Sequence, residues 1–252
     1  MIVCMLDCQS NFRGTSAPLT QRGVNAACEM LDVDPQTIWT VILVETAGCG
    51  FLPDRRPVIL FERHVFSEWT GGVYDEIAPT ISSHIPGYYG QVGYGQYDRL
   101  ILAMKLDTKA ALYSASWGLG QILGYNFRSA GYTCVEDMVT EFCNSEDAQL
   151  LAMARYCHRR GLADELRRGD WTAFAFSYNG PSFHKNRYDA RLNAAHRDLE
   201  EFGFPDLSVR ADQMRLTFGG FAPGGVDGFC GPLTLAALER ERLYLLQSHG
   251  PV

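Results

Sequence analysis

The sequence Val41-Ile42-Leu43-Val44-Glu45-Thr46-Ala47-Gly48 is an aliphatic run that ends in a single carboxylate and a glycine. Asp34 and Pro35 precede it and are typical of a helix cap and first turn. The apolar spacing predicts a helix with Glu45 in its last turn before Gly48. Apolar surroundings and the negative end of the helix dipole both disfavour an ionised carboxylate, which would suit a general acid. On this segment alone, a surface glutamate at a frayed helix end is the simpler interpretation.

Composition limits the classes of partner. With 252 residues, 46% of them hydrophobic, the chain can form one large domain, or a medium domain with a small appendage. The net charge of -7 and the absence of a Lys/Arg run argue against a nucleic-acid partner. Residues 1–8 lack the basic region of a secretion signal, and no apolar stretch has the length of a membrane span. We therefore expect a monomer that does not insert stably into a membrane.

The eight cysteines show neither a C-x-x-C pair nor a Cys/His cluster at zinc spacing. We therefore expect no metal and no cofactor. Cys28, Cys143 and Cys157 fall within apolar helical patterns, where a free thiol behaves as a small hydrophobe. A reducing compartment is the simplest account, and a disulfide between distant cysteines stays open.

Periodicity and capping signals predict a mainly helical chain after an irregular lead over residues 1–18. Residues 57–64 alternate and predict a short extended segment that carries Glu62. Residues 65–96 read mostly as loop, and the tyrosines of 88–95 suit either sugar stacking or ordinary loop anchoring. The expected helices, several with caps at Thr20, Thr108, Thr133, Ser145 and Asp170, cover residues 20–31, 35–47, 97–104, 108–115, 133–143, 145–161, 170–177 and 185–201.

Two further segments combine small residues with polar groups. Residues 114–124 are rich in glycine and include Gln121, whose amide both donates and accepts hydrogen bonds. This segment suits close approach to a ligand, and equally a tight crossing between helices. Tyr178-Asn179-Gly180 places a hydroxyl and an amide at a helix end, where a polar ligand or a simple turn would both fit.

The composition shifts after Gly203, and we place a domain boundary there. The tail reads as a helix over 209–216, a glycine-rich turn and a second helix from Pro232. By periodicity it is a small helical appendage.

Three segments taken together, around Glu45, Ser116–Ile122 and Ser177–Gly180, resemble the signatures of the goose-type lysozyme and lytic transglycosylase superfamily. When residues 59–66 and 178–181 are included, the sequence more closely resembles one branch of this superfamily, the N-acetylmuramidase domain of modular phage endolysins. The resemblance extends over about residues 19–201. It implies a mainly α, lysozyme-like catalytic domain over 19–203 with a short β element, followed by a helical module over 204–252. Residues 226–234 more weakly resemble a peptidoglycan-binding helical domain, so the tail either binds the wall or packs on the enzyme.

The resemblance implies that Glu45 protonates the glycosidic oxygen between N-acetylmuramic acid and N-acetylglucosamine in bacterial peptidoglycan. Glu62 is the first choice for the second carboxylate that glycosidases use, with Asp98 and Asp189 as other possibilities. Alternatively, Glu62 forms a structural ion pair with Arg63. The implied sugar-binding residues are Gln121, Tyr178 and Asn179, joined by Ser116 and His64.

Three alternatives stay open. A lytic transglycosylase would use the same glutamate but release 1,6-anhydro products. A wall-binding protein would hold glycan without cutting it, and a helical scaffold unrelated to sugars would leave the ordered motifs as coincidence. For an endolysin we expect synthesis in the host cytoplasm without a signal peptide, and action on the wall in the periplasm after membrane disruption.

Overall fold

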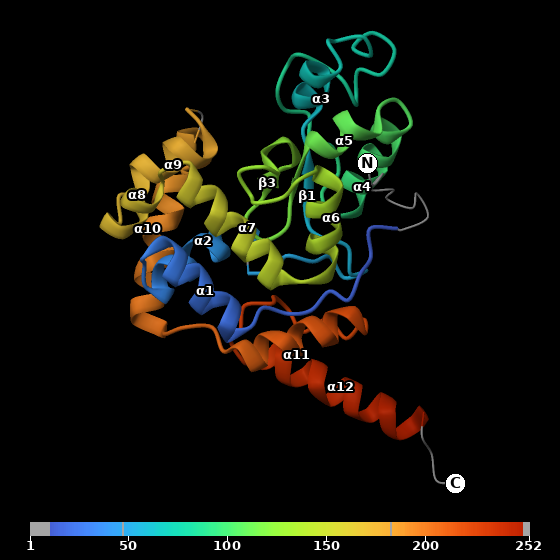
Figure 1. Ribbon diagram of the computed structural model, residues 1–252. Helices are drawn as coiled ribbons and strands as arrows, with labels where there is room; N and C mark the ends of the chain where they lie inside the picture. Colours follow the sequence, from blue (N-terminus) through green and yellow to red (C-terminus); the bar gives the residue numbers. More distant parts are fainter. Residues whose placement is uncertain (1–10, 47, 182, 249–252) are drawn as a thin grey trace.

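The computed structural model describes residues 11–46, 48–181 and 183–248 (Figure 1). Most of the expected N-terminal lead, with Cys4 and Cys8, lies outside these residues. The fold is mainly α with one small sheet, as the sequence predicts. Figure 1 shows α7 (Glu146–Arg159) running between two groups of elements, with α1, α2 and α8–α10 on one side and the sheet with α3–α6 on the other. The twelve α-helices found in the described residues are α1 Gln21–Leu31, α2 Pro35–Thr46, α3 Arg63–Trp69, α4 Tyr94–Met104, α5 Thr108–Tyr113, α6 Val135–Asn144, α7 Glu146–Arg159, α8 Ala163–Arg168, α9 Trp171–Asn179, α10 Tyr188–Phe202, α11 Leu207–Phe218 and α12 Pro232–Ser248.

The helix that carries Glu45 is formed by the signals read from the sequence. Asp34 Oδ1 accepts a hydrogen bond from the Thr37 amide at 2.8 Å, and α2 ends at Thr46. Nearly all of its residues from Thr37 to Val44 are buried, because α2 packs between α1 and α10. Glu45 therefore lies at the end of a core helix rather than on a surface helix.

The glycine-rich segment is a β-hairpin and not a crossing between helices. Strands β1 (Ile59–Phe61), β2 (Ala115–Trp117) and β3 (Ile122–Leu123) form an antiparallel sheet in the order β1-β2-β3. Ser116 pairs with Leu60 on one side and Leu123 on the other. The hairpin loop requires Gly118, because φ is +65° and a Cβ there would lie 2.7 Å from the Gln149 side chain.

Several predicted boundaries are wrong for local reasons. Residues 63–69 form α3, whereas the sequence predicted the end of a strand followed by a loop. The N-cap residue of α3, Glu62, makes no capping hydrogen bond with its side chain, so the sequence held no capping signal for this helix. The short helix α8 was not predicted. Asp107 caps α5 in place of Thr108, and the helix stops at Tyr113. Cys134 caps α6 in place of Thr133, which donates to Asp137 Oδ2 instead.

The predicted pair of tail helices is confirmed as α11 and α12, which lie beneath the end of α2 in Figure 1. A small apolar cluster joins the tail to the rest of the chain. It consists of Phe51 with Met214 and Val226, all of them buried. The tail therefore packs on the segment that follows Glu45.

Candidate active site

Glu45 is partly buried in the last turn of α2, where its carboxylate meets α10. The hydroxyl of Tyr188 donates a hydrogen bond to Glu45 Oε1. Arg191, one turn further along α10, donates to the Val44 carbonyl at 2.7 Å. Burial raises the pKa of Glu45 to about 7, while the Tyr188 hydrogen bond and the Arg191 charge act in the opposite direction. With a pKa of about 7, this carboxyl group is about half protonated at neutral pH.

Tyr188 is a site residue that sequence reasoning missed. It falls on the apolar face of α10 with Leu192 and Leu199, so the pattern indicates only a core position. The side chain is 5% exposed, and burial raises the pKa of its hydroxyl well above the usual value. In the sequence, the only feature of Tyr188 that indicates a polar role is its hydroxyl group.

Tyr178 and Asn179 lie beside Glu45, in the last turn of α9. Asn179 is exposed and its side chain hydrogen-bonds to Tyr188. The Tyr178 hydroxyl donates to the Gly120 carbonyl at 2.6 Å, and its ring stacks on Phe174 with centroids 5.0 Å apart. The structure thus brings this predicted pair together with Glu45, and ties it to the β2–β3 hairpin.

Ser116 and Gln121 are brought together within that hairpin. Gln121 donates to the carbonyls of Gly118 at 2.9 Å and Val58 at 3.3 Å, and accepts from Ser116 Oγ at 2.9 Å. Gln121 also adopts φ +45°, which costs a residue with a side chain some conformational energy. The polar atoms of this amide are engaged by protein atoms. Its evident structural role is to fix the shape of the hairpin loop against Tyr178.

Glu62 and His64 form a second group, at the end of β1. The Glu62 amide donates to the Ser114 carbonyl at 2.8 Å, and its Oε2 lies 3.3 Å from His64 Nδ1. Burial raises the pKa of Glu62 to about 7, and Arg99 and a hydrogen bond from Tyr89 act to lower it. Sequence reasoning did not single out Arg99 or Tyr89.

The predicted alternative, a structural ion pair between Glu62 and Arg63, is wrong. Arg63 donates instead to the carbonyls of Pro79 at 3.1 Å and Ile85 at 3.2 Å. Its guanidinium group also lies 5.0 Å from the centroid of the Tyr88 ring. Arg63 therefore holds the following loop, and the charge that acts on Glu62 is that of Arg99.

Several aromatic side chains interact with Arg160 or with one another. Tyr156 contacts the Tyr178 ring edge-on at 5.6 Å and hydrogen-bonds to Arg160. Arg160 and Glu62 both act electrostatically on Tyr125, whose ring centroid lies 6.2 Å from that of Trp69. Trp69, at the C-terminal end of α3, is 50% exposed, so its apolar ring is available to a ligand.

The other two carboxylates considered from the sequence lie elsewhere. Asp98 is exposed on α4, and Asp189 accepts from Thr172 Oγ1 at 3.5 Å in the first turn of α10.

A cavity of about 570 Å³ also lies away from Glu45, between the α1–α2 turn and α8; it is lined by Cys28, Glu29, Asp32, Val33, Asp34, Thr37 and Arg167. Among the described residues, no group of three or more His, Cys, Asp or Glu side chains could hold a metal ion.

The fold is lysozyme-like and mainly helical, and it holds a partly buried carboxyl group in contact with Tyr188. The family model of N-acetylmuramidase matches residues 34–200, which include every predicted site residue. The chain therefore belongs to the N-acetylmuramidase family, whose members are peptidoglycan hydrolases.

A solved structure agrees with this assignment. The crystal structure of a Burkholderia AP3 phage endolysin matches with a TM-score of 0.66 and 32% sequence identity. The match covers 76% of this chain and 74% of the endolysin. No match was found among curated proteins.

Proposed function

We propose that this chain is a phage endolysin that cleaves the bond between N-acetylmuramic acid and N-acetylglucosamine, with Glu45 as the general acid. The observation that carries the proposal is the carboxyl group at the end of α2. It is partly buried, contacts Tyr188, has a pKa raised to about 7 by burial, and lies inside the segment matched by the family. General acids work best when their pKa is near the working pH.

The surroundings of Glu45 suit both halves of a proton transfer. Before transfer, burial favours the protonated acid. As the proton moves to the glycosidic oxygen, a negative charge develops on the carboxylate. The Tyr188 hydroxyl and the Arg191 guanidinium group stabilise that charge. Protonated Glu45 and ionised Glu45 therefore have similar free energies near neutral pH, so the proton can be given up and taken back.

Glu62 is our choice for the second carboxylate. In its ionised form it can accept a proton from an attacking water, and Arg99 and Tyr89 stabilise that form. The pKa values alone do not assign the roles, because burial raises those of both Glu45 and Glu62 to about 7. The assignment rests on position: Glu45 contacts Tyr188, which also hydrogen-bonds to the exposed Asn179, whereas Glu62 Oε2 lies 3.3 Å from His64 Nδ1 at the end of β1.

The remaining site residues have distinct proposed roles in binding peptidoglycan. Asn179 presents an exposed amide to the sugar, and Trp69 offers an aromatic face for stacking. Tyr178, Gln121 and Ser116 keep the hairpin loop in place beside the reacting bond. His64 helps to orient Glu62.

The test is a digest of purified murein by the wild type and by Glu45→Gln, with mass analysis of the released muropeptides. One added water on each new muramic end supports hydrolysis. Products that lack this water and carry a 1,6-anhydro end would identify a lytic transglycosylase. Murein that stays uncleaved after incubation with the wild type would instead support binding without cleavage.

We also propose that the protein is made in the host cytoplasm, works as a monomer and reaches the cell wall after membrane disruption, with residues 204–252 available to contact the wall. The similarity to a phage endolysin supports action on the cell wall. Within the described residues, no helix has the length and apolar character needed to span a bilayer. Fractionation of expressing cells, with and without a membrane-permeabilising agent, tests the order: lysis is expected only after permeabilisation.

A further inference from the structure

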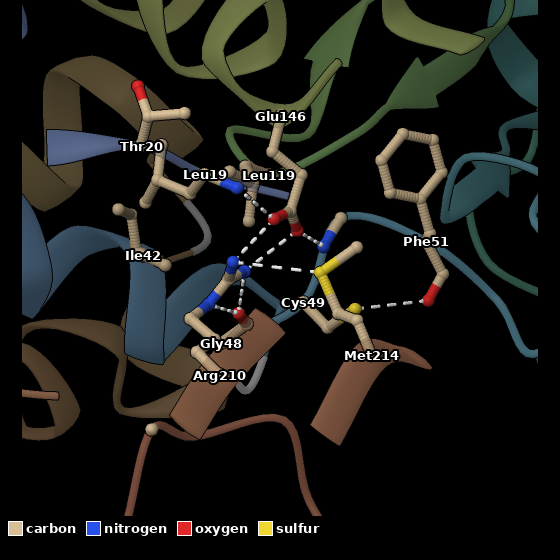
Figure 2. Close-up of polar contacts among 12 residues, drawn as sticks. Leu19, Thr20, Ile42, Gly48, Cys49, Phe51, Leu119, Glu146, Arg210 and Met214 are labelled. Atoms are coloured by element: carbon tan, nitrogen blue, oxygen red, sulfur yellow. Dashed lines mark hydrogen bonds and ion pairs between the residues drawn. The ribbon is translucent and has the colours of Figure 1, made fainter. Parts of the chain in front are cut away.

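A buried ion pair connects the C-terminal helices to the catalytic segment. Arg210 of α11 and Glu146, the first residue of α7, are both 0% exposed (Figure 2). Arg210 Nη2 donates to Glu146 Oε1 at 2.7 Å, and Nη1 donates to Oε2. Burying two charges is costly unless their remaining hydrogen-bonding atoms are also paired. The partners of those atoms therefore indicate what the ion pair holds.

Apart from Met214 Sδ, which lies 3.8 Å from Arg210 Nη1, those partners are backbone groups, mostly in the segment that follows Glu45. Arg210 Nε donates to the Gly48 carbonyl at 2.9 Å, and Nη2 donates to the same oxygen. Glu146 Oε1 accepts from the Gly50 amide at 2.8 Å, and Oε2 accepts from the Leu19 amide at 2.9 Å. The ion pair thus fixes a carbonyl and an amide that lie three and five residues after Glu45.

The tail makes three further contacts with the same segment. Gly48 has φ +93°, and a Cβ there would lie 2.6 Å from the Val226 carbonyl oxygen, so only glycine permits this approach. Phe51 is 4% exposed against Met214 and Val226. The Arg55 guanidinium group lies 4.9 Å from the centroid of the Phe218 ring.

We propose that Arg210 is a positioning residue for Glu45, and that the C-terminal helices are thereby an integral part of the active site. Arg210 holds Gly48 directly and Gly50 through Glu146, so the backbone from Gly48 to Gly50 is anchored to α7 and α11. Anchoring these residues restrains the last turn of α2 against α10, where Glu45 contacts Tyr188. The inference rests on the proposed role of Glu45, and adds to it a residue outside the segment matched by the family.

The choice of residues supports positioning over simple stabilisation. A buried ion pair adds little stability compared with well-packed apolar side chains of similar volume. Apolar side chains, however, could not bond the Gly48 carbonyl and the Gly50 amide. What the pair supplies in addition is directional contact with the backbone next to the catalytic residue.

The experiment uses the full chain and the double variant Arg210→Met/Glu146→Gln, which leaves no unpaired charge in the core. Arg210→Lys is the conservative variant, because it keeps the charge but not the paired donors. Arg240→Met is the matched control. Arg240 donates to the carbonyls of Phe221 and Ala222 within the tail itself, at 2.6 and 3.2 Å.

Two measurements follow, on variants shown to be folded by circular dichroism. Hydrogen exchange of the Gly50 amide reports directly on the segment, and we expect it to be at least about tenfold faster in the double variant. Kinetics on soluble murein oligosaccharides report on Glu45. We expect kcat to fall about tenfold with KM changed less than about twofold, a smaller loss for Arg210→Lys, and wild-type values for Arg240→Met.

The pH profile separates positioning from a general loss of stability. If the segment loosens, Glu45 becomes more hydrated, so the basic limb of kcat should move to lower pH. The titratable and charged groups around Glu45 are Tyr188 and Arg191 of α10, Tyr178 of α9 and Cys157 of α7, and none of these is altered in the variants.

Several outcomes would overturn the proposal. Unchanged Gly50 exchange, or unchanged kcat and pH profile in a folded variant, would leave Arg210 a purely structural residue. Loss of activity on whole murein but not on soluble oligosaccharides would assign the tail to wall binding. If the double variant does not fold, the same measurements on Arg210→Lys decide. If Glu45→Gln is active, the proposed function fails, and Gly50 exchange still shows whether Arg210 holds the segment.

Discussion

The Tyr188 hydroxyl donates a hydrogen bond to Oε1 of Glu45 across 143 residues of sequence. This contact and the burial of Glu45 have opposite effects on its pKa. Burial favours the protonated carboxyl, whereas a donated hydrogen bond favours the carboxylate. Burial has the larger effect, and the pKa rises to about 7. Tyr188 thus keeps Glu45 from becoming too weak an acid to release its proton.

Replacement of Tyr188 by Phe should therefore raise the pKa of Glu45 further. Because a general acid works in its protonated form, the basic limb of the kcat profile should move to higher pH, by about one unit for a hydrogen bond to a charged group. The pH profile of murein hydrolysis checks the direction. Tyr74→Phe is a matched control, because Tyr74 donates to the Leu106 carbonyl and not to Glu45. A basic limb that stays in place or moves to lower pH would contradict the assignment.

Glu45→Gln should abolish most of the activity without unfolding the chain. Gln keeps the shape of the side chain and can still accept the Tyr188 hydrogen bond, but it has no proton to give to the leaving oxygen. The loss of general-acid catalysis is expected to lower kcat about 10²- to 10⁴-fold. Dye release from labelled murein measures it. Lysis at the wild-type rate by the folded variant would reject Glu45 as the acid.

The same substitution should change how stability depends on pH. The pKa of Glu45 is about 7 when folded, compared with 4.5 for an unperturbed glutamate, so the folded chain holds its proton more tightly. This contribution to stability is complete below pH 4.5 and is lost as the pH rises through about 7. Its loss is at most about 3 kcal/mol. Urea unfolding at pH 5 and pH 8 should therefore show Glu45→Gln gaining stability relative to the wild type at the higher pH.

Glu62→Gln tests the second carboxylate. If Glu62 activates water, the folded variant should lose activity nearly as deeply as Glu45→Gln, because an amide cannot accept the proton. Circular dichroism checks the fold and murein hydrolysis checks the rate. His64→Gln is a useful comparison and should show a smaller loss, since His64 contacts Glu62 at 3.3 Å and is not itself assigned proton transfer. Wild-type activity in Glu62→Gln would remove Glu62 from the mechanism.

The sequence predicted the parts of the fold whose signals are local. Asp34, Thr20, Ser145 and Asp170 each cap the helix that the sequence assigned to them. The helix end at Glu45 followed from such a cap and from the apolar spacing behind it. At α3, where the cap was missing, the helix was not predicted; at α5 the helix was predicted, but its cap is Asp107 and not Thr108.

The contacts that complete the site depend on tertiary structure and leave no local signal. Tyr188 reads as a core residue on an apolar helix face, and its role arises only because α10 packs on α2. Arg210 and Glu146 read as ordinary charged residues on exposed helix surfaces. Their burial against each other follows from the docking of α11, 64 residues away in sequence. Without a known partner, charge alone predicts exposure.

Gln121 and Asn179 were both predicted to bind sugar. From the structure we expect substitutions of these two residues to have different effects, one on stability and the other on KM. Gln121 bonds the Gly118 and Val58 carbonyls and Ser116, so Gln121→Ala should lower the free energy of unfolding by about 1–3 kcal/mol as these groups lose their partner. Asn179 is exposed and hydrogen-bonds to Tyr188, so Asn179→Ala should lower the free energy of unfolding by no more than about 1 kcal/mol and act mainly on KM for murein oligosaccharides. Urea unfolding and steady-state kinetics on both variants measure the contrast. If the Gln121→Ala variant is as stable as the wild type and has a raised KM, Gln121 binds sugar, because its amide would then contribute to ligand binding and not to the stability of the hairpin.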